Sequence, residues 1–130
     1  MSEATTVGED RAGAVTGDTG ELLALARRIA GSARHGEELE VYVARGVETD
    51  IRAYEGEIES LSSASSAGVG IRVVAGGRQG FAYAGSLDEA VVAETLAEAR
   101  DNVGFATPDP HVGLAGPDGV TPVVVDVWDD

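Results

Sequence analysis

Residues Ile58–Gly85, IESLSSASSAGVGIRVVAGGRQGFAYAG, decide the fold of this chain of 130 residues. Apolar side chains occupy alternate positions in two runs, Val69–Val73 and Phe81–Tyr83, which is the period of a half-buried strand. The tetrapeptide Ala75–Arg78 separates the runs. Hairpin turns of the primed types need a positive φ, which Gly76 and Gly77 reach without a Cβ clash. The stretch therefore predicts a β-hairpin.

The side chains of this hairpin divide between two faces. Phe81 and Tyr83 are expected in the core, with a peptide groove as the alternative place for Tyr83. Arg72 alternates out of phase with its apolar neighbours and is expected on the face opposite the core. It is either a solvated arginine or an anchor for a peptide carboxylate or a partner's acidic group, and Arg78 is a second candidate contact.

An amphipathic helix is predicted over Gly20–Ala33. His35-Gly36 follows as its end, with glycine in the position that favours left-handed backbone. Met1–Thr19, which precedes it, is small, polar, acidic and without periodicity, and we expect a disordered tail. The apolar stripe of the helix consists of Leu22, Leu25, Ala26, Ile29 and Ala33.

Three further strands are predicted between this helix and the hairpin. Leu39–Ala44 alternates and is interrupted by Gly46, after which Val47–Tyr54 alternates again. Glu57–Ala64 follows a turn, but Ile58 and Leu61 differ in parity, so one face holds both only if a bulge intervenes near Glu59-Ser60. The serines beyond Leu61 predict a polar strand end at a sheet edge or near a partner surface.

A second helix begins after the hairpin. Ser86-Leu87-Asp88-Glu89 has the residues of a capping box, and the helix is expected to run to about Asn102 or Val103 before Gly104. A connector rich in proline and glycine follows, and Val123–Trp128 has the composition of a strand at the end of the chain. The residues expected to face the sheet are Leu87, Val91, Leu96, Ala99 and Val103.

These elements predict an α+β fold with an antiparallel sheet of four to five strands and two helices, one N-terminal and one after the central hairpin. We expect three regions: an acidic tail over residues 1–19, an α+β domain over 20–107, and a connector with a strand over 108–130 that leads into a missing C-terminal region.

Composition limits the partners of the chain. The net charge of -14 and pI of about 4.3 disfavour nucleic acid and anionic membranes. There is no cysteine, which excludes disulfides and sulfur-ligated zinc. No apolar run approaches the roughly 20 residues that cross a bilayer, and no signal pattern opens the chain, so a cytoplasmic location is expected.

No catalytic or metal-binding residue can be assigned from the sequence. His35 and His111 lack a second ligand at helical spacing, so both are interpreted as surface histidines. The serines lack a glycine elbow and a base. The glycines of the hairpin precede strands and not a helix N-terminus, which disfavours a phosphate cradle.

The hairpin resembles a known family. Ala67–Val73 with Gly77–Tyr83, preceded by Glu55–Ser60 and followed by Thr107–Pro110 and Gly113, is similar to the N-terminal domain of the TldD/PmbA family, also called modulators of DNA gyrase. The Thr-Pro-Asp-Pro element resembles the PmbA (TldE) branch more than the TldD branch. The resemblance extends over about residues 21–113.

The resemblance implies a function in a larger assembly. Members of the family are cytoplasmic zinc metallopeptidases that form TldD/TldE or related dimers and cleave unfolded or modified peptides. The zinc motif of the family, His-Glu-x-x-x-His, lies downstream and is absent from this chain. The implied role is that of a module, inactive alone, that forms a dimer with a TldD-like subunit or with itself and helps to wall the peptide chamber.

Two other interpretations stay open at this point. A stand-alone acidic regulator would mimic the charge of nucleic acid to bind gyrase or another DNA-binding protein. A fragment whose only property is folding is the third. Mimicry needs carboxylates ordered along one face, whereas much of the acidity here lies in the predicted tail and in turns.

Overall fold

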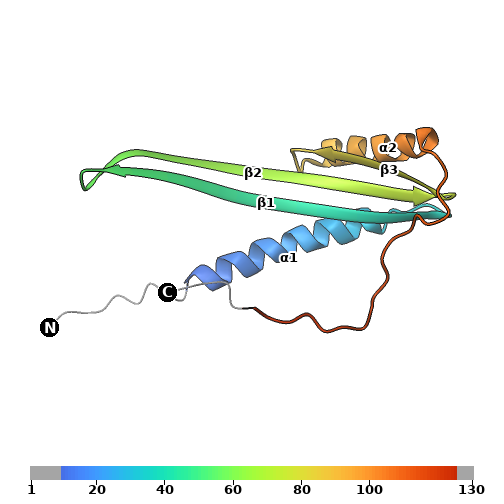
Figure 1. Cartoon of the computed structure of the whole chain (residues 1–130), viewed down its shortest axis with the longest axis horizontal. Coiled ribbons are helices and arrows are strands. Elements are labelled where there is room, and N and C mark those ends of the chain that lie inside the picture. Colours follow the sequence, from blue (N-terminus) through green and yellow to red (C-terminus); the bar gives the residue numbers. More distant parts are fainter. Residues whose placement is uncertain (1–9, 126–130) are drawn as a thin grey trace.

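The structure, a computed structural model, describes the backbone of residues 10–125 and the side chains of residues 19–125. It is an α+β fold in which two helices pack on a three-stranded antiparallel sheet (Figure 1). The elements in chain order are α1 (Asp10–Ala30), β1 (Glu37–Tyr54), β2 (Glu57–Ala75), β3 (Arg78–Ala84) and α2 (Glu89–Phe105).

The sheet has fewer and longer strands than expected. Its order is β1-β2-β3, and β1 with β2 forms one ribbon from Glu37 opposite Ala75 to Tyr54 opposite Glu57. Gly46 does not interrupt β1 but pairs with Ser66, because glycine also adopts extended backbone and the neighbouring pairs hold the register. The expected four to five strands are therefore three.

Both hairpin turns use left-handed backbone. Gly76 and Gly77 have φ values of 58° and 72°, and Ala75 pairs with Arg78, which confirms the predicted two-residue turn. The turn between β1 and β2 consists of Glu55 and Gly56, with φ values of 51° and 82°. Glu55 is the only described residue other than glycine with a positive φ.

The core lies on one face of the sheet, beneath both helices. Val69, Ile71 and Val73 of β2 are buried there, as the alternation predicted. Ile29 of α1 belongs to the same cluster, so α1 and α2 cover the same face. The cluster is completed by Ala82 of β3 and by Val92 and Ala99 of α2.

Phe81 and Tyr83 are not in the core, contrary to our expectation. They are 56% and 78% exposed on the opposite face, while Gly80 and Ala82 face α2. A Cβ on Gly80 would meet the backbone of α2 at Ala99 and Val103 well inside van der Waals contact. The helix approaches β3 so closely that only the smallest side chains fit between them.

Helix α1 starts earlier and ends earlier than predicted. It begins at Asp10, so residues 10–19, expected as part of the tail, are helical, while residues 1–9 lie outside the described part. Once the packed turns form, further turns need no new nucleus. The helix ends at Ala30, and Gly36 has the expected left-handed backbone, with φ of 81°, immediately before β1.

The start of α2 differs from a capping box. Asp88 is the N-cap and its side chain makes no capping bond, while Ser86 Oγ accepts a hydrogen bond from the Asp88 N–H at 3.1 Å. Val92 is buried in place of the expected Val91. Leu87, Leu96, Ala99 and Val103 pack on the core as predicted.

The segment after α2 is pinned to the central hairpin. The backbone N–H of Asp109 donates to the carbonyl of Gly77 at 2.7 Å, and Asp109 Oδ1 accepts from the N–H of His111 at 2.8 Å. Val123–Val125 is exposed and not a strand, since no partner strand lies beside it in the described chain. The rest of the predicted terminal strand, residues 126–128, lies outside the described part.

The close approach of α2 and β3 leads to a first prediction. Gly80→Ala should lower the free energy of unfolding by about 3 kcal/mol, at the upper end of typical overpacking costs, because backbone has to move on both sides. Urea denaturation followed by circular dichroism measures this. Gly85→Ala is the matched control, since a Cβ there meets nothing within 4 Å, and equal stability of the two variants would contradict the packing.

Candidate functional site

The face of the sheet opposite the helices is the candidate site, and we call it the open face. Strand alternation brings outward side chains of all three strands together on it. Tyr42, Gly70 and Tyr83 lie in one cross-strand row, and Glu40, Arg72 and Phe81 lie in the next. Two of the three sequence-predicted contacts, Arg72 and Tyr83, are therefore neighbours on this face.

Three exposed aromatic rings surround a glycine on the open face. Tyr42 is 72% exposed, and the rings of Phe81 and Tyr83 stack with centroids 6.3 Å apart. A Cβ on Gly70 would lie 3.4 Å from the Phe81 ring, so glycine leaves room for that ring over β2. Aromatic rings with free faces on a sheet offer an apolar platform with hydroxyl groups at its edge.

Arg72 is held in place by its neighbours. Its Nε donates to Glu40 Oε1 at 3.2 Å and its Nη2 to Glu40 Oε2 at 2.7 Å, a bidentate pair across β1 and β2. Its Nη1 donates to Gln79 Oε1 at 3.4 Å. The guanidinium is thus oriented before any ligand arrives, and an incoming carboxylate would compete with Glu40.

Arg78 lies apart from this site. It pairs with Ala75 beside the turn and has the inward parity of β3, so the sheet separates it from Arg72 and Tyr83. Tyr42 and Phe81 are the members of the site that the sequence analysis did not find. For Tyr42, its outward position in the alternation of Leu39–Ala44 could have indicated this face. For Phe81, the small residues Gly80 and Ala82 on either side of it could have indicated that they, and not the ring, face the helix.

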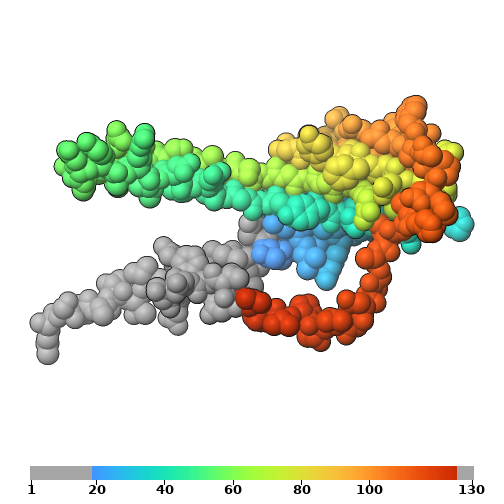
Figure 2. Space-filling model, viewed as in Figure 1, coloured from blue at the N-terminus to red at the C-terminus, as the bar shows by residue number. Residues whose placement is uncertain are grey.

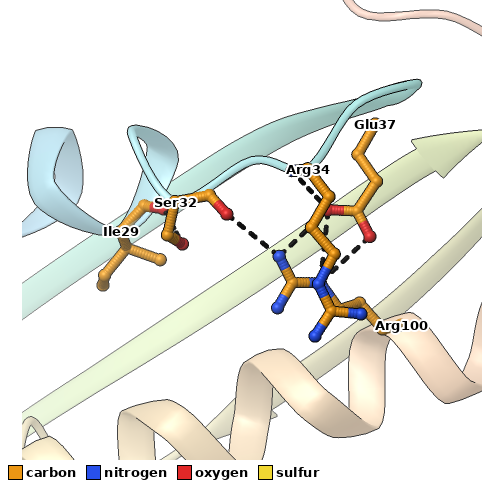
Figure 3. A network of polar contacts seen from close by, with 5 residues as sticks. All are labelled: Ile29, Ser32, Arg34, Glu37 and Arg100. Atoms are coloured by element: carbon orange, nitrogen blue, oxygen red, sulfur yellow. Dashed lines mark hydrogen bonds and ion pairs between the residues drawn. The ribbon is translucent and has the colours of Figure 1, made fainter.

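A second polar cluster joins α2 to the start of β1 (Figure 3). Arg100 Nε donates to both Glu37 oxygens, at 3.0 and 3.2 Å, and its Nη2 donates to the same carboxylate and to the carbonyl of Ser32. The Arg34 N–H donates to Glu37 Oε2 at 3.0 Å. Both side chains of the ion pair are largely buried, and both oxygens of Glu37 accept hydrogen bonds, which indicates a structural role.

Electrostatics in this cluster favour the ionised carboxyl group. The hydrogen bond from Arg100 is the main cause that lowers the pKa of Glu37 below its ordinary value, with a further contribution from the Arg34 N–H against the opposing effect of burial.

Among residues 19–125, whose side chains are described, no group of three or more His, Cys, Asp and Glu could hold a metal ion. His35 and His111, interpreted from the sequence as surface residues, are both exposed. None of the described helices is long and apolar enough to cross a membrane.

Comparison with known proteins identifies the fold. A family model described as PmbA/TldA metallopeptidase domain 1 matches residues 39–107, more than half of the chain. TldE from Thermococcus kodakarensis has a similar structure, with a TM-score of 0.56 and 25% sequence identity over 76% of this chain and 21% of that chain. No curated protein matches the sequence.

The chain belongs to the TldD/PmbA family and represents its N-terminal domain, as the resemblance of the central hairpin implied. It spans about a fifth of the length of the archaeal TldE that it resembles.

The Glu37–Arg100 pair leads to a prediction about pH. Folding lowers the pKa of Glu37, so the pair stabilises the fold at pH values above the pKa of the unfolded chain, about 4.5. This stabilisation is lost as the pH falls through the pKa of the folded protein. Glu37→Gln should reduce the free energy of unfolding at pH 7 by about 1 kcal/mol.

Urea titrations of both proteins at pH 7 and at pH 3 test this. The difference between wild type and Glu37→Gln should shrink at pH 3, whereas an equal difference at both values would refute the linkage. Glu38→Gln changes the exposed neighbouring residue and should have little effect at either pH.

Proposed function

We propose that this chain is the N-terminal module of a non-catalytic, PmbA/TldE-like subunit in a zinc metallopeptidase assembly. In that assembly it pairs with a TldD-like subunit and helps to wall the chamber in which peptides are cleaved. The observation that carries the proposal is the match of residues 39–107 to domain 1 of the family together with the similarity to an archaeal TldE. The hydrolytic zinc belongs to the partner subunit.

The sheet supports a role in holding an extended peptide. β3 ends at Ala84, opposite Val69, while β2 continues to Glu57, so the β3-side edge of β2 before Val69 has no strand partner within the described chain. Unpaired backbone groups on such an edge accept an added strand. The open face, with Arg72 and Tyr83, lies next to this edge and would contact alternate side chains of the peptide.

Arg78 has a different place in the proposal. It points to the helix side of the sheet, so it is a candidate contact for the partner subunit and not for a peptide on the open face.

The assembly is tested by mixing the chain with a TldD-like subunit from the same organism. We expect a heterodimer in analytical ultracentrifugation, no peptide cleavage by the chain alone, and no zinc retained by it after dialysis. Stoichiometric zinc in the dialysed chain, or the absence of any complex with the subunit, would overturn the proposal.

The peptide contact is tested in the assembled complex with an unfolded peptide substrate. Tyr83→Ala should raise KM several-fold with kcat unchanged, because it removes binding shared by the ground state and the transition state. Phe105→Ala is the matched control, since that ring is 90% exposed at the end of α2, away from the open face. An unchanged KM for Tyr83→Ala would exclude the contact.

Charge mimicry toward gyrase or another DNA-binding protein receives less support. Glu37, Glu40 and Glu59 each pair with an arginine, so these carboxylates are not presented as a free row of charges. Measurement of salt-dependent gyrase binding by the chain separates the two functions, since no binding at low salt would exclude charge mimicry.

A further inference from the structure

The ribbon of β1 and β2 projects beyond β3 and α2, and its end with the turn projects beyond α1 as well; we call residues 45–66 the arm. Figure 1 shows the paired strands continuing to the Glu55-Gly56 turn, and Figure 2 shows the arm standing out from the body of the molecule. All of these residues are exposed in the described structure. The arm is therefore a two-stranded sheet with two open faces.

One face of the arm carries four exposed apolar side chains, Val47, Ile51, Ile58 and Leu61, which we call the ridge. The hydrogen-bonded pair of Thr49 and Ser63 lies between Val47 and Ile51 on the same face. The register places Ile51 directly opposite Leu61, and Ile58 opposite Ala53 in the next inward row. This parity is that of Leu39, Val41 and Val43, which pack on the core, so the ridge continues the buried face of the sheet past the helices. The four side chains are 71%, 60%, 65% and 62% exposed, in the order given.

A β-bulge keeps the ridge on one face. The pairing shifts between Arg52 and Ala53, so that Glu59 has no partner on β1. Without this extra residue Ile58 and Leu61 would point to opposite faces, as the sequence predicted. Bulges bend and twist a strand at the expense of ladder hydrogen bonds, so one that aligns two exposed apolar residues indicates that the aligned face is used.

The other face of the arm is mainly polar, with the exposed Tyr54 next to its turn. Glu48, Asp50 and Arg52 of β1 project from it, opposite Ala64, Ser62 and Ser60 of β2. A ribbon whose large aliphatic side chains lie on one face, with charged side chains on the other, has the pattern of a sheet that is covered on one side. The four side chains of the ridge nevertheless remain exposed in the described structure.

Burial of the ridge in an interface would lower the free energy of the arm. A two-stranded hairpin on its own is marginally stable in water. Full burial of a valine, leucine or isoleucine side chain is worth about 1.5–3 kcal/mol relative to exposure. Partial burial of four such side chains would supply several kcal/mol to an interface, against the cost of association and of ordering the ribbon.

The charge of the arm distinguishes between a second copy of the chain and a basic partner as the surface that covers the ridge. The arm holds five carboxylates, Glu48, Asp50, Glu55, Glu57 and Glu59, and two arginines, Arg45 and Arg52, which is a net charge of -3. Arg52 already pairs with Glu59 at 3.4 Å. Two copies of the arm facing each other would bring like charges together, in a chain whose net charge is -14. A basic partner is favoured instead.

We propose that the arm docks by its apolar ridge into an apolar groove, rimmed with arginine or lysine, on the partner subunit. The identity of that partner rests on the function proposed above, while the ridge and the carboxylates of the opposite face and the turn are properties of this chain. The ridge supplies affinity through burial, and these carboxylates supply orientation and a faster encounter.

The test measures the Kd of the chain for a TldD-like subunit from the same organism by isothermal titration calorimetry. Ile51→Thr with Leu61→Thr removes the cross-strand apolar pair and keeps high strand propensity. We expect Kd to rise about a hundredfold, as for two central interface residues. Ser60→Ala with Ser62→Ala is the matched control on the polar face and should leave Kd within about twofold.

Salt dependence tests the basic rim. Kd of the wild type should rise as NaCl is increased from 50 to about 500 mM, because charge pairs at the rim are screened. Glu48→Gln with Glu55→Gln and Glu57→Gln should reduce that dependence. Thermal unfolding of every variant shows whether the helix-covered body is intact. Urea denaturation of the Ile51→Thr/Leu61→Thr variant, compared with the Ser60→Ala/Ser62→Ala control, shows whether the ribbon itself has lost stability.

Each outcome decides something different. If the Ile51→Thr/Leu61→Thr variant binds as tightly as the wild type, or if salt does not weaken wild-type binding, the docking of the arm is overturned. The proposed function then stays in place. A ridge-dependent dimer of the chain alone in sedimentation replaces the basic partner with a second copy and also overturns the proposal. No binding of the wild type to the subunit overturns both the docking and the function.

Discussion

The contact between α2 and β3 is the constraint on which the rest of the structure depends. Gly80 leaves room for the backbone of α2 at Ala99 and Val103, and Ala82 is buried beside it. This short distance places the small residues of β3 inward and the rings of Phe81 and Tyr83 outward. A buried core and an exposed aromatic face are therefore two results of the same packing, because the side-chain period of a strand allows no other arrangement.

The sheet consequently has two different environments along its length. Where the helices cover it, Ile71 and Val73 are fully buried and the opposite face is free to display Arg72 in its bidentate pair with Glu40. Beyond the helices the same inward parity becomes the exposed ridge of the arm. A domain that uses one continuous ribbon for its own core and for a projecting surface is suited to a larger assembly, which agrees with its membership of the TldD/PmbA family.

Local signals in the sequence predicted local structure well. The Gly76-Gly77 turn, the burial of Val69, Ile71 and Val73, and the bulge beside Glu59 all follow from backbone geometry and side-chain period, which short segments contain in full. The start of α1 and the continuity of β1 through Gly46 were missed, because both depend on neighbouring packed turns or paired strands that extend an element beyond its own propensity. Of the three candidate contacts, Arg72 and Tyr83 lie on one face of the sheet and Arg78 has the parity of the other face, an arrangement that depends on pairing between strands and not on the residues alone.

By itself, the sequence determined the hairpin, the alternation of its side chains, the α+β class and the family. It could not determine which of two alternating sets in β3 faces the core, since hydrophobicity favours the rings and only the distance to α2 excludes them. Nor could it determine that the ridge of the arm is exposed, because an apolar face has the same pattern whether or not a helix covers it. Tertiary structure decided both, because the position of a helix relative to a sheet is set by contacts between residues far apart in the chain.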